Sequence, residues 1–297
     1  MSSCAEGHLL LASAQAGSAE DDAIEAARAV LAEAGPVELV STATPEELDR
    51  ALDACGSRSL VVAGGDGSLH LAVTRLRARG ELADRPIALV PLGTGNDLAR
   101  ALGLPLDPAE AARLVLTGRH LPMDLLADDS GGIVINAVHV GVGAEAAASA
   151  GRLKPLLGLL AYPLGAVFAG LRSTGWRLRV EVDGKVLADD HRRSLMVGIG
   201  NGPSIGGGTP LLPHACPDDG LLDVVVSRAT GPLARVRYGN ALRDGSHLTD
   251  PDVRTARGRT VTISGEPVGV NADGELGDQV TRRTWTVEAG AWSLLRP

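Results

Sequence analysis

The sequence predicts an α/β fold made of two domains. The first, residues 1–122, is an α/β domain with a parallel sheet, and the second, residues 123–297, is a mainly antiparallel β domain. Strand and helix patterns alternate through the first part, which is typical of a parallel sheet with helices on both faces. Strand patterns dominate after Met123. No Pro/Ser-rich linker separates the parts, so we expect closely joined domains with a cleft between them, and the last strand is a candidate to return to the first domain.

Short apolar runs and helix-start signals define the first domain. Thr44-Pro45-Glu46-Glu47 and Asp107-Pro108-Ala109-Glu110 are capping boxes, which predict helices to about Cys55 and Leu116. Ser18 is a predicted N-cap before a helical apolar stripe. Strands are predicted at residues 7–12, 37–42, 60–63 and 86–90.

The second domain shows frequent strand patterns and few helical ones. Val182-Asp183-Gly184-Lys185 predicts a hairpin turn. Helical patterns occur only near residues 144–172 and 231–243. Strands are predicted at 123–127, 132–140, 176–182, 192–200, 221–227, 259–264, 267–272 and 284–288.

The composition limits the classes of function. The chain has 297 residues, 44% of them hydrophobic, which is enough for a sizeable core, but only 2% are aromatic. The net charge of −8 and the shortage of aromatic rings argue against nucleic-acid binding. Three scattered cysteines form no CxxC pair, so neither a disulfide framework nor a zinc site is expected. The N-terminus shows no signal-peptide pattern, which favours a cytoplasmic location.

One apolar segment, residues 153–171, has about the length of a membrane span. It also contains Lys154, two prolines and three glycines, so we expect a helical element of a soluble domain. Contact with an acyl chain and simple core packing are both open for it.

Two glycine-rich loops carry the clearest chemical signal. Gly64-Gly65-Asp66-Gly67-Ser68 follows one predicted strand and opens a helix, and Pro91-Leu92-Gly93-Thr94-Gly95-Asn96-Asp97 does the same after the next strand. Glycines let main-chain N–H groups approach an anion, and a helix N-terminus adds partial positive charge. Two such loops on neighbouring strand ends could line one nucleotide. The alternatives are an ordinary tight turn for the first loop, and a simple helix cap from Asn96 or Asp97 for the second.

In combination with later motifs, these loops resemble the lipid-kinase family of diacylglycerol and sphingosine kinases. The later motifs occur in the same order as in that family, and they are Val197–Gly202, Gly206–Gly208, Pro217–Asp223 and Asp273–Glu275. The first loop alone is shared with NAD kinases. The resemblance implies an α/β nucleotide domain, a β-rich lipid domain, and Mg²⁺-dependent transfer of a phosphoryl group from ATP to a lipid hydroxyl.

The resemblance also implies site residues. The ATP contacts would come from Thr42 at the end of a strand and from the two loops, including Gly64, Gly65, Asp66, Gly67, Ser68, Leu69, Gly93, Thr94, Gly95, Asn96 and Asp97. A metal site of structural or regulatory type would use the side chain of Asp219 and the backbone carbonyls of Cys216 and Leu221; an ordinary acidic turn is the alternative.

The carboxylates Glu275, Asp66 and Asp273 are the candidate catalytic residues. By resemblance Glu275 is the proton acceptor, and Asp66 is the competing base, because a carboxylate in reach of the hydroxyl could take its proton. The sequence leaves the choice open. Asp-Gly at 273–274 is also a common hairpin turn.

The chain departs from the family pattern at three places. Residues 13–17 retain only a glycine and small residues of the usual Asn-Pro-x-Ser-Gly turn, which puts that phosphate contact in doubt. Ser68 replaces a threonine and keeps its hydroxyl. His70-Leu71 replaces an Asn-Glu pair, so any role of that acid is absent.

Three functions therefore remain in competition: a lipid kinase, which is favoured, an NAD kinase, and a catalytically silent protein that binds lipid or nucleotide. The second loop and the apolar segment at 156–171 favour a lipid over a dinucleotide. Expected partners are a lipid substrate and, transiently, a membrane surface; a homodimer is also an open expectation.

Overall fold

The computed structural model describes residues 7–14, 18–141 and 174–297, and the apolar segment at 153–171 lies outside these residues. The contacts divide the chain into two compact units, Met1–Met123 with Gly290–Pro297, and Asp124–Ala289. No helix in the described part of the chain is long and apolar enough to span a membrane.

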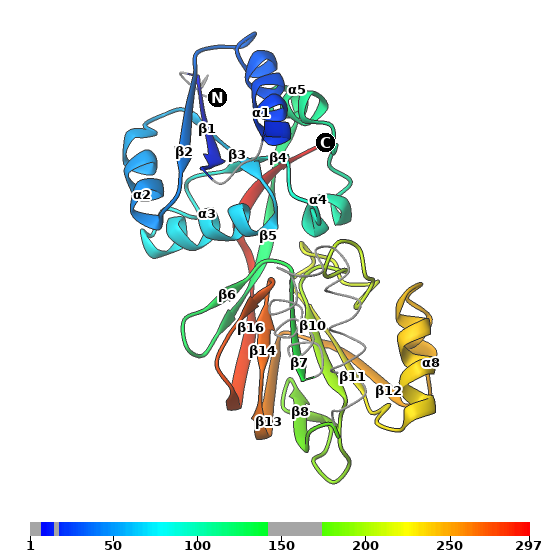
Figure 1. Ribbon diagram of the computed structural model, residues 1–297. Helices are drawn as coiled ribbons and strands as arrows, with labels where there is room; N and C mark the ends of the chain where they lie inside the picture. Colours follow the sequence, from blue (N-terminus) through cyan, green and yellow to red (C-terminus); the bar gives the residue numbers. More distant parts are fainter. Residues whose placement is uncertain (1–6, 15–17, 142–173) are drawn as a thin grey trace. The chain divides into compact units, whose positions relative to one another are not determined.

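The first unit is a parallel sheet covered by helices. Its strands lie in the order β2-β1-β3-β4-β16, and the end of β16 joins β4 in parallel through Leu294 and Ile87. The helices α1 and α5 pack together over one face, where Ala27 and Ala111 enter the same apolar core (Figure 1). The elements are β1 (His8–Ser13), α1 (Ser18–Leu31), β2 (Val37–Thr42), α2 (Pro45–Ala54), β3 (Ser59–Gly64), α3 (Asp66–Ala78), β4 (Ile87–Pro91), α4 (Asp97–Ala101), α5 (Pro108–Thr117), the start of β5 (Arg119–Asp128) and the end of β16 (Val280–Arg296).

Both helix starts predicted from the capping boxes are confirmed by N-cap side-chain bonds. The Thr44 hydroxyl accepts a hydrogen bond from the Glu47 N–H at 3.3 Å, and the Glu47 carboxylate accepts one from the Ala43 N–H at 2.7 Å. The Asp107 carboxylate accepts from the Glu110 N–H at 2.9 Å. These bonds satisfy N–H groups that a helix start otherwise leaves without partners, so the local sequence fixes where α2 and α5 begin.

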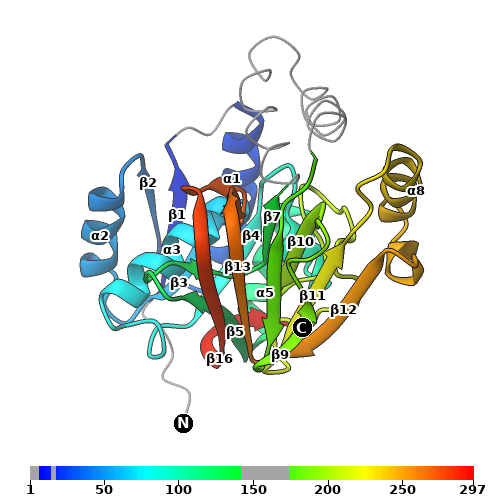
Figure 2. The same ribbon diagram turned by 90° about the horizontal axis from the view of Figure 1, so that it is seen from below.

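The second unit is a pair of packed, mainly antiparallel sheets (Figure 2). One contains β16-β13-β8-β9, and the other has the order β12-β11-β10-β7-β14-β15. Alternate residues of both, such as Val138, Val224, Ile263 and Trp285, form one buried core. The elements are β6 (Ile133–Val134), β7 (Ala137–Gly141), β8 (Leu178–Val182), β9 (Lys185–Ala188), β10 (Met196–Gly200), β11 (Leu222–Ser227), α8 (Pro232–Leu242), η2 (Ser246–Thr249), β12 (Val253–Gly258), β13 (Thr260–Val268), β14 (Val270–Ala272) and β15 (Glu275–Leu276).

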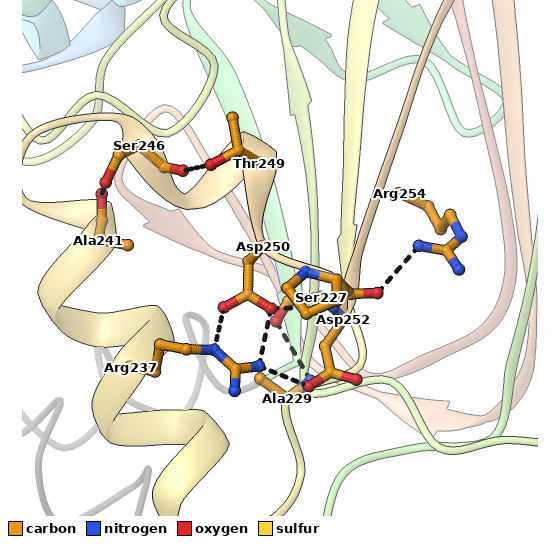
Figure 3. Close-up of polar contacts among 10 residues, drawn as sticks. Ser227, Ala229, Arg237, Ala241, Ser246, Thr249, Asp250, Asp252 and Arg254 are labelled. Carbon is orange, nitrogen blue, oxygen red and sulfur yellow. Dashed lines mark hydrogen bonds and ion pairs between the residues drawn. The ribbon is translucent and has the colours of Figure 1, made fainter.

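Helix α8 is tied to this unit by a buried carboxylate. Arg237 donates to both oxygens of Asp250, at 2.6 and 2.8 Å, and to Asp252 at 2.7 Å (Figure 3). The Arg237 guanidinium, by hydrogen bonding, lowers the pKa of Asp250. Tyr238, on the buried side of α8, joins an apolar cluster with Met196 and Val225 on the outer face of the second sheet. The helix is therefore held at a defined place over β10 and β11.

Candidate functional site

The residues predicted to contact ATP lie at the carboxyl ends of four parallel strands, all on the same side of the first sheet. The register pairs Ser13 with Thr42 and Gly64 with Pro91. The Thr42 hydroxyl donates to the Ala12 carbonyl at 3.5 Å. In parallel α/β sheets this edge is where ligands bind. Thr42 and both glycine loops thus lie on the side of the sheet expected for a nucleotide.

The two glycine loops touch through their main chains. The Leu92 N–H donates to the Gly64 carbonyl at 3.1 Å. A Cβ added to Gly93 would lie 2.6 Å from the Gly65 Cα, and one added to Gly65 would lie 2.9 Å from the Gly93 Cα. Neither position can hold a side chain without moving backbone. The glycines here permit a close approach of two loops, in addition to any approach to a ligand.

Asp66 joins the two loops. One carboxylate oxygen accepts from the Asp97 N–H at 2.9 Å, and the other accepts from the Leu98 N–H at 3.2 Å. Asp66, which begins α3, therefore caps the start of α4. Asn96 occupies the N-cap position but makes no side-chain cap bond, so the simple cap expected from Asn96 is wrong.

Asn96 shapes the second loop. Its backbone is left-handed, with φ 50°, and its Nδ2 donates to the Gly93 carbonyl at 2.6 Å. Its buried Oδ1 has no hydrogen-bond partner among the described residues. Thr94 is exposed, as is Gly67 in the first loop, so both are accessible to a ligand. Leu69, in contrast, is fully buried, and its N–H donates to the Gly65 carbonyl, which anchors the start of α3; its contact with ATP stays a prediction.

Asp273 organises a second polar cluster, within the β unit. One carboxylate oxygen accepts from the Ile135 N–H at 2.7 Å; the other accepts from the Asn136 and Ala137 N–H groups at 3.0 and 2.9 Å. Its backbone is left-handed, with φ 48°. Three N–H bonds hold the turn 273–275 against the segment before β7. Glu275, at the start of β15, is exposed.

Two asparagines complete this cluster, and neither was among the predicted site residues. Asn201 is fully buried, and its Nδ2 donates to the carbonyls of Asp124 at 3.0 Å and Ile135 at 2.9 Å. Its N–H donates to the Asn136 carbonyl at 2.8 Å. Asn201 lies inside the motif Val197–Gly202, so a signal existed. Asn136 carried no such signal, because residues 132–140 have the pattern of one continuous strand. In the structure Asn136 lies between β6 and β7.

The predicted metal residues lie at an ionic turn of the β unit. Asp219 accepts from the Leu221 N–H at 3.0 Å and forms an ion pair with Arg257, which also contacts Asp223 at 3.1 Å. The thiol of Cys216 donates to Asp218, and this bond raises the pKa of Cys216. The described residues contain no group of three or more His, Cys, Asp or Glu side chains that could hold a metal. The predicted set has one carboxylate and two carbonyls, so this finding does not test it.

Burial and charge act against each other at Asp223. Desolvation raises the pKa of Asp223, and the neighbouring Arg257 lowers it. A cation at Asp219 would have to compete with the Arg257 guanidinium. The ion pairs account for the acidic turn without a metal, and the metal site stays a prediction.

The α/β unit with its two glycine loops and the β unit with its Asp-Gly-Glu turn each match a family model of lipid kinases or their relatives. Residues 8–127 match the diacylglycerol kinase catalytic domain, and residues 136–296 match the YegS C-terminal NAD kinase beta sandwich-like domain. The chain belongs to this diacylglycerol-kinase-like lipid kinase family, and the resemblance read from the motifs is confirmed.

Individual relatives agree with this assignment. A probable lipid kinase YegS-like from Pseudomonas aeruginosa is 36% identical over 281 residues, covering 90% of this chain and 86% of the relative. A diacylglycerol kinase from Mycobacterium tuberculosis is 30% identical over 249 residues, covering 82% of this chain and 78% of the relative. A crystal structure of a diacylglycerol kinase from Bacillus anthracis has a TM-score of 0.75 at 23% identity, with 98% of this chain and 97% of that chain covered. The last likeness confirms the fold, an α/β part followed by a mainly antiparallel β part.

Proposed function

We propose that the protein is an ATP- and Mg²⁺-dependent lipid kinase that phosphorylates the hydroxyl of a lipid such as diacylglycerol. The observation that carries the proposal is the pair of glycine loops in main-chain contact, clamped by Asp66, at the carboxyl edge of a parallel sheet. Membership of a lipid kinase family supports it.

In this proposal the loops bind the phosphates of ATP. The exposed Gly67 and Thr94 offer main-chain N–H groups and one hydroxyl, and the N-terminus of α3 adds partial positive charge. Phosphoryl transfer depends mainly on positioning and charge neutralisation, which such a cradle supplies.

Mg²⁺ fits the donor types of the first loop. Asp66 supplies the hard carboxylate oxygen that this cation prefers, beside the loops that would hold the phosphates. The bound ion would neutralise charge on the transferring group. Asp219 is the other candidate, although its ion pair with Arg257 is a competitor there.

The lipid hydroxyl must lose its proton as its oxygen bonds to the γ-phosphorus and the bond to the ADP oxygen breaks. We propose Glu275 as the acceptor of that proton. Its exposure supports this, whereas Asp66 and Asp273 already accept two and three hydrogen bonds from main-chain N–H groups. Asp66 and Asp273 are then positioning residues.

Transfer of labelled phosphate from ATP to a panel of diacylglycerols, sphingoid bases and polyprenols tests the function. We expect Mg²⁺-dependent transfer to at least one of them. Transfer to NAD instead would support the NAD kinase alternative. Nucleotide binding by calorimetry without turnover on any acceptor would support a silent binding protein.

We also propose a transient contact with anionic membrane surfaces, because the acceptor lipid resides there. Leu233 and Val236, 86% and 63% exposed, lie one turn apart on the outer face of α8. The helix contains no acidic residue and two arginines, of which Arg237 is already paired with Asp250 and Asp252, so Arg235 is the cation offered to the membrane. Flotation with vesicles containing phosphatidylglycerol should decrease in Leu233→Ser/Val236→Ser; unchanged flotation would contradict the contact. A homodimer and a cytoplasmic location stay predictions.

A further inference from the structure

The segment 135–137 joins β6 to the start of β7, and two residues hold its main chain. Its three N–H groups donate to the Asp273 carboxylate, and its last carbonyl, that of Ala137, accepts from the Asp273 N–H at 3.0 Å. The other two carbonyls accept from Asn201: that of Ile135 from the amide Nδ2 at 2.9 Å, and that of Asn136 from the main-chain N–H at 2.8 Å. Asp273 and Asn201 together therefore bind every main-chain N–H and carbonyl group of this segment.

The side chain of Asn201 also reaches β5. The second N–H of its amide donates to the Asp124 carbonyl at 3.0 Å. Asn201 itself directly follows β10, whose last residue, Gly200, is the register partner of Ala137 in β7. One amide thus ties together β5, the end of β10 and the segment before β7.

The burial of Asn201 is costly, which indicates a specific role. The residue is fully buried, and its Oδ1 has no hydrogen-bond partner among the described residues. The amide cannot be flipped to satisfy that oxygen, because Nδ2 already serves two carbonyls that accept only from donors. Burying an unpaired amide oxygen costs free energy that an apolar side chain would not cost. A buried polar group of this kind fixes one arrangement of the groups that it joins, so we interpret the amide as a device for placing the segment 135–137.

The residues after Asn201 hold Asn136 as well. The Gly202 N–H donates to the Asn136 carbonyl at 2.7 Å, and the Asn136 Nδ2 donates to the Ser204 carbonyl at 2.8 Å. A Cβ added to Gly202 would lie 2.0 Å from the Asn136 Oδ1, so only a glycine leaves room for that side chain. The Asn-Gly pair at 201–202 therefore supplies both the donor and the space that the segment needs.

The segment in turn fixes the turn that carries Glu275. Glu275 comes two residues after Asp273 and begins β15, a strand of two residues that ends its sheet in the described part of the chain. The pairing of Glu275 with Ala272 of β14 spans the same turn. A strand this short gives little support of its own, so the place of Glu275 depends on how firmly Asp273 is bound to the segment 135–137, and on how firmly Asn201 holds that segment.

We propose that Asn201 is a positioning residue for phosphoryl transfer: through the segment 135–137 and Asp273 it holds the Glu275 carboxylate in the place where it accepts the proton of the lipid hydroxyl. The inference deepens the proposed kinase function and rests on Glu275 as the proton acceptor. A catalytic group has to be held within about 0.5 Å of its productive geometry. Loss of the Asn201 amide should therefore slow the chemical step, and ATP binding, which we assign to the glycine loops of the α/β unit, should not change.

A double-mutant cycle with Glu275 tests the proposal. Asn201→Ala removes both amide donors, and we expect kcat with diacylglycerol in mixed micelles to decrease about 10–100-fold, with KM for ATP unchanged. In a Glu275→Gln background no base remains to be positioned, so the same substitution should change kcat by less than about 2-fold. An equal fold decrease in both backgrounds would overturn the proposal, because a general loss of structure acts with or without the base.

Asp183→Gly is the matched control. The Asp183 carboxylate also accepts from two main-chain N–H groups of the β unit, those of Arg259 and Thr260 at 3.0 and 2.9 Å. Its backbone is left-handed, with φ 48°, so glycine removes these bonds without strain. We expect kcat to stay at the wild-type value in this variant. A decrease as large as that of Asn201→Ala would overturn the positioning role, since any comparable loss of bonds would then have the same effect.

Two further measurements keep the proposal testable if Asn201→Ala does not fold or the wild type transfers no phosphate. Asn136→Ala removes the side-chain bond to Ser204 and should show a smaller decrease in kcat that again disappears in the Glu275→Gln background; an equal decrease in both backgrounds overturns the proposal. Absence of transfer to every lipid would count against the kinase function itself. In that case hydrogen exchange decides the positioning: the N–H groups of residues 273–277 should exchange faster in Asn201→Ala or Asn136→Ala than in the wild type and in Asp183→Gly, and unchanged exchange overturns it.

Discussion

Asp66 in the α/β unit and Asp273 in the β unit both use a carboxylate to join two segments of the chain. The two differ in how clearly the sequence marks the segments that they join. Each carboxylate binds main-chain N–H groups of a remote segment, at 97–98 for Asp66 and at 135–137 for Asp273. The first clamp joins two glycine-rich loops that are both visible as motifs. The second joins an Asp-Gly turn to a segment without any motif. The comparison teaches that a clamp between two glycine loops can be predicted from local motifs, whereas the clamp at Asp273 is assembled by long-range pairing.

The largest expected effect comes from the contact between the glycine loops. Gly93→Ala places a Cβ against the Gly65 backbone, which cannot move as a flexible side chain would. We expect a loss of about 1–3 kcal/mol in the free energy of unfolding and loss of ATP binding. Urea unfolding and calorimetric titration with ATP measure both. Normal ATP affinity in this variant would show that the loop contact is not needed for the nucleotide.

The stability of the β unit should depend on pH through the buried His139. His139 has its pKa lowered to about 4 by burial, so between pH 6.5 and about 4 the unfolded chain binds a proton that the folded chain does not. The contribution of the neutral His139 to the free energy of unfolding is therefore fully present above pH 6.5. It is lost as the pH decreases, by up to about 3 kcal/mol. The free energy of unfolding, measured with urea from pH 7 to 4.5, should decrease more steeply with falling pH in the wild type than in His139→Leu. Equal slopes would contradict a buried neutral His139.

The two carboxylate clamps can be compared directly. Asp66→Asn and Asp273→Asn should each destabilise by about 1–3 kcal/mol, because N–H groups lose a charged acceptor. Asp273→Asn should cost more, since Asp273 accepts from the three N–H groups at 135–137 and Asp66 accepts from the two at 97–98 in the described part of the chain. Chemical unfolding of both variants gives the order. The reverse order would show that bond number does not set the strength of the clamps.

The smallest expected effect is a gain in stability at Gly239, a glycine without the close backbone contact that Gly93 makes. An added Cβ at Gly239, inside α8, meets nothing within 4 Å. Gly239→Ala should stabilise the protein by about 1 kcal/mol through helix propensity alone. A rise in Tm with unchanged kcat/KM for ATP is the expected result. A fall in Tm would mean that the outer face of α8 is more crowded than its exposure indicates.

Much of the α/β unit could be predicted from the sequence because its signals are local. The capping boxes at Thr44 and Asp107 fixed two helix starts, and apolar runs located four strands. Asp66 was recognised as important, but its role as the cap of α4 was not, because the cap connects residues 31 positions apart.

The β unit was harder to predict because its strands depend on distant partners. The strand β12 (Val253–Gly258) was missed: it has the charged residues Arg254 and Arg257 at its solvent positions, and it is a strand because it pairs with β11. β16, expected only at 284–288, runs from Val280 to Arg296 because β13 and β4 pair with different parts of it. The asparagines at 136 and 201 met for the same reason, through the register of β7 and β10.

The central claim is that Glu275 accepts the proton of a lipid hydroxyl, while Asp66 joins the two glycine loops and Asp273 holds the turn 273–275 against residues 135–137. Its most direct measurement is labelled phosphate transfer from ATP to diacylglycerol by the wild type and by Glu275→Gln. We expect transfer by the wild type and a decrease of about 10²–10⁴-fold in kcat, with Tm and ATP affinity unchanged because Glu275 is exposed. Full activity of Glu275→Gln, or no transfer to any lipid alcohol by the wild type, would contradict the claim.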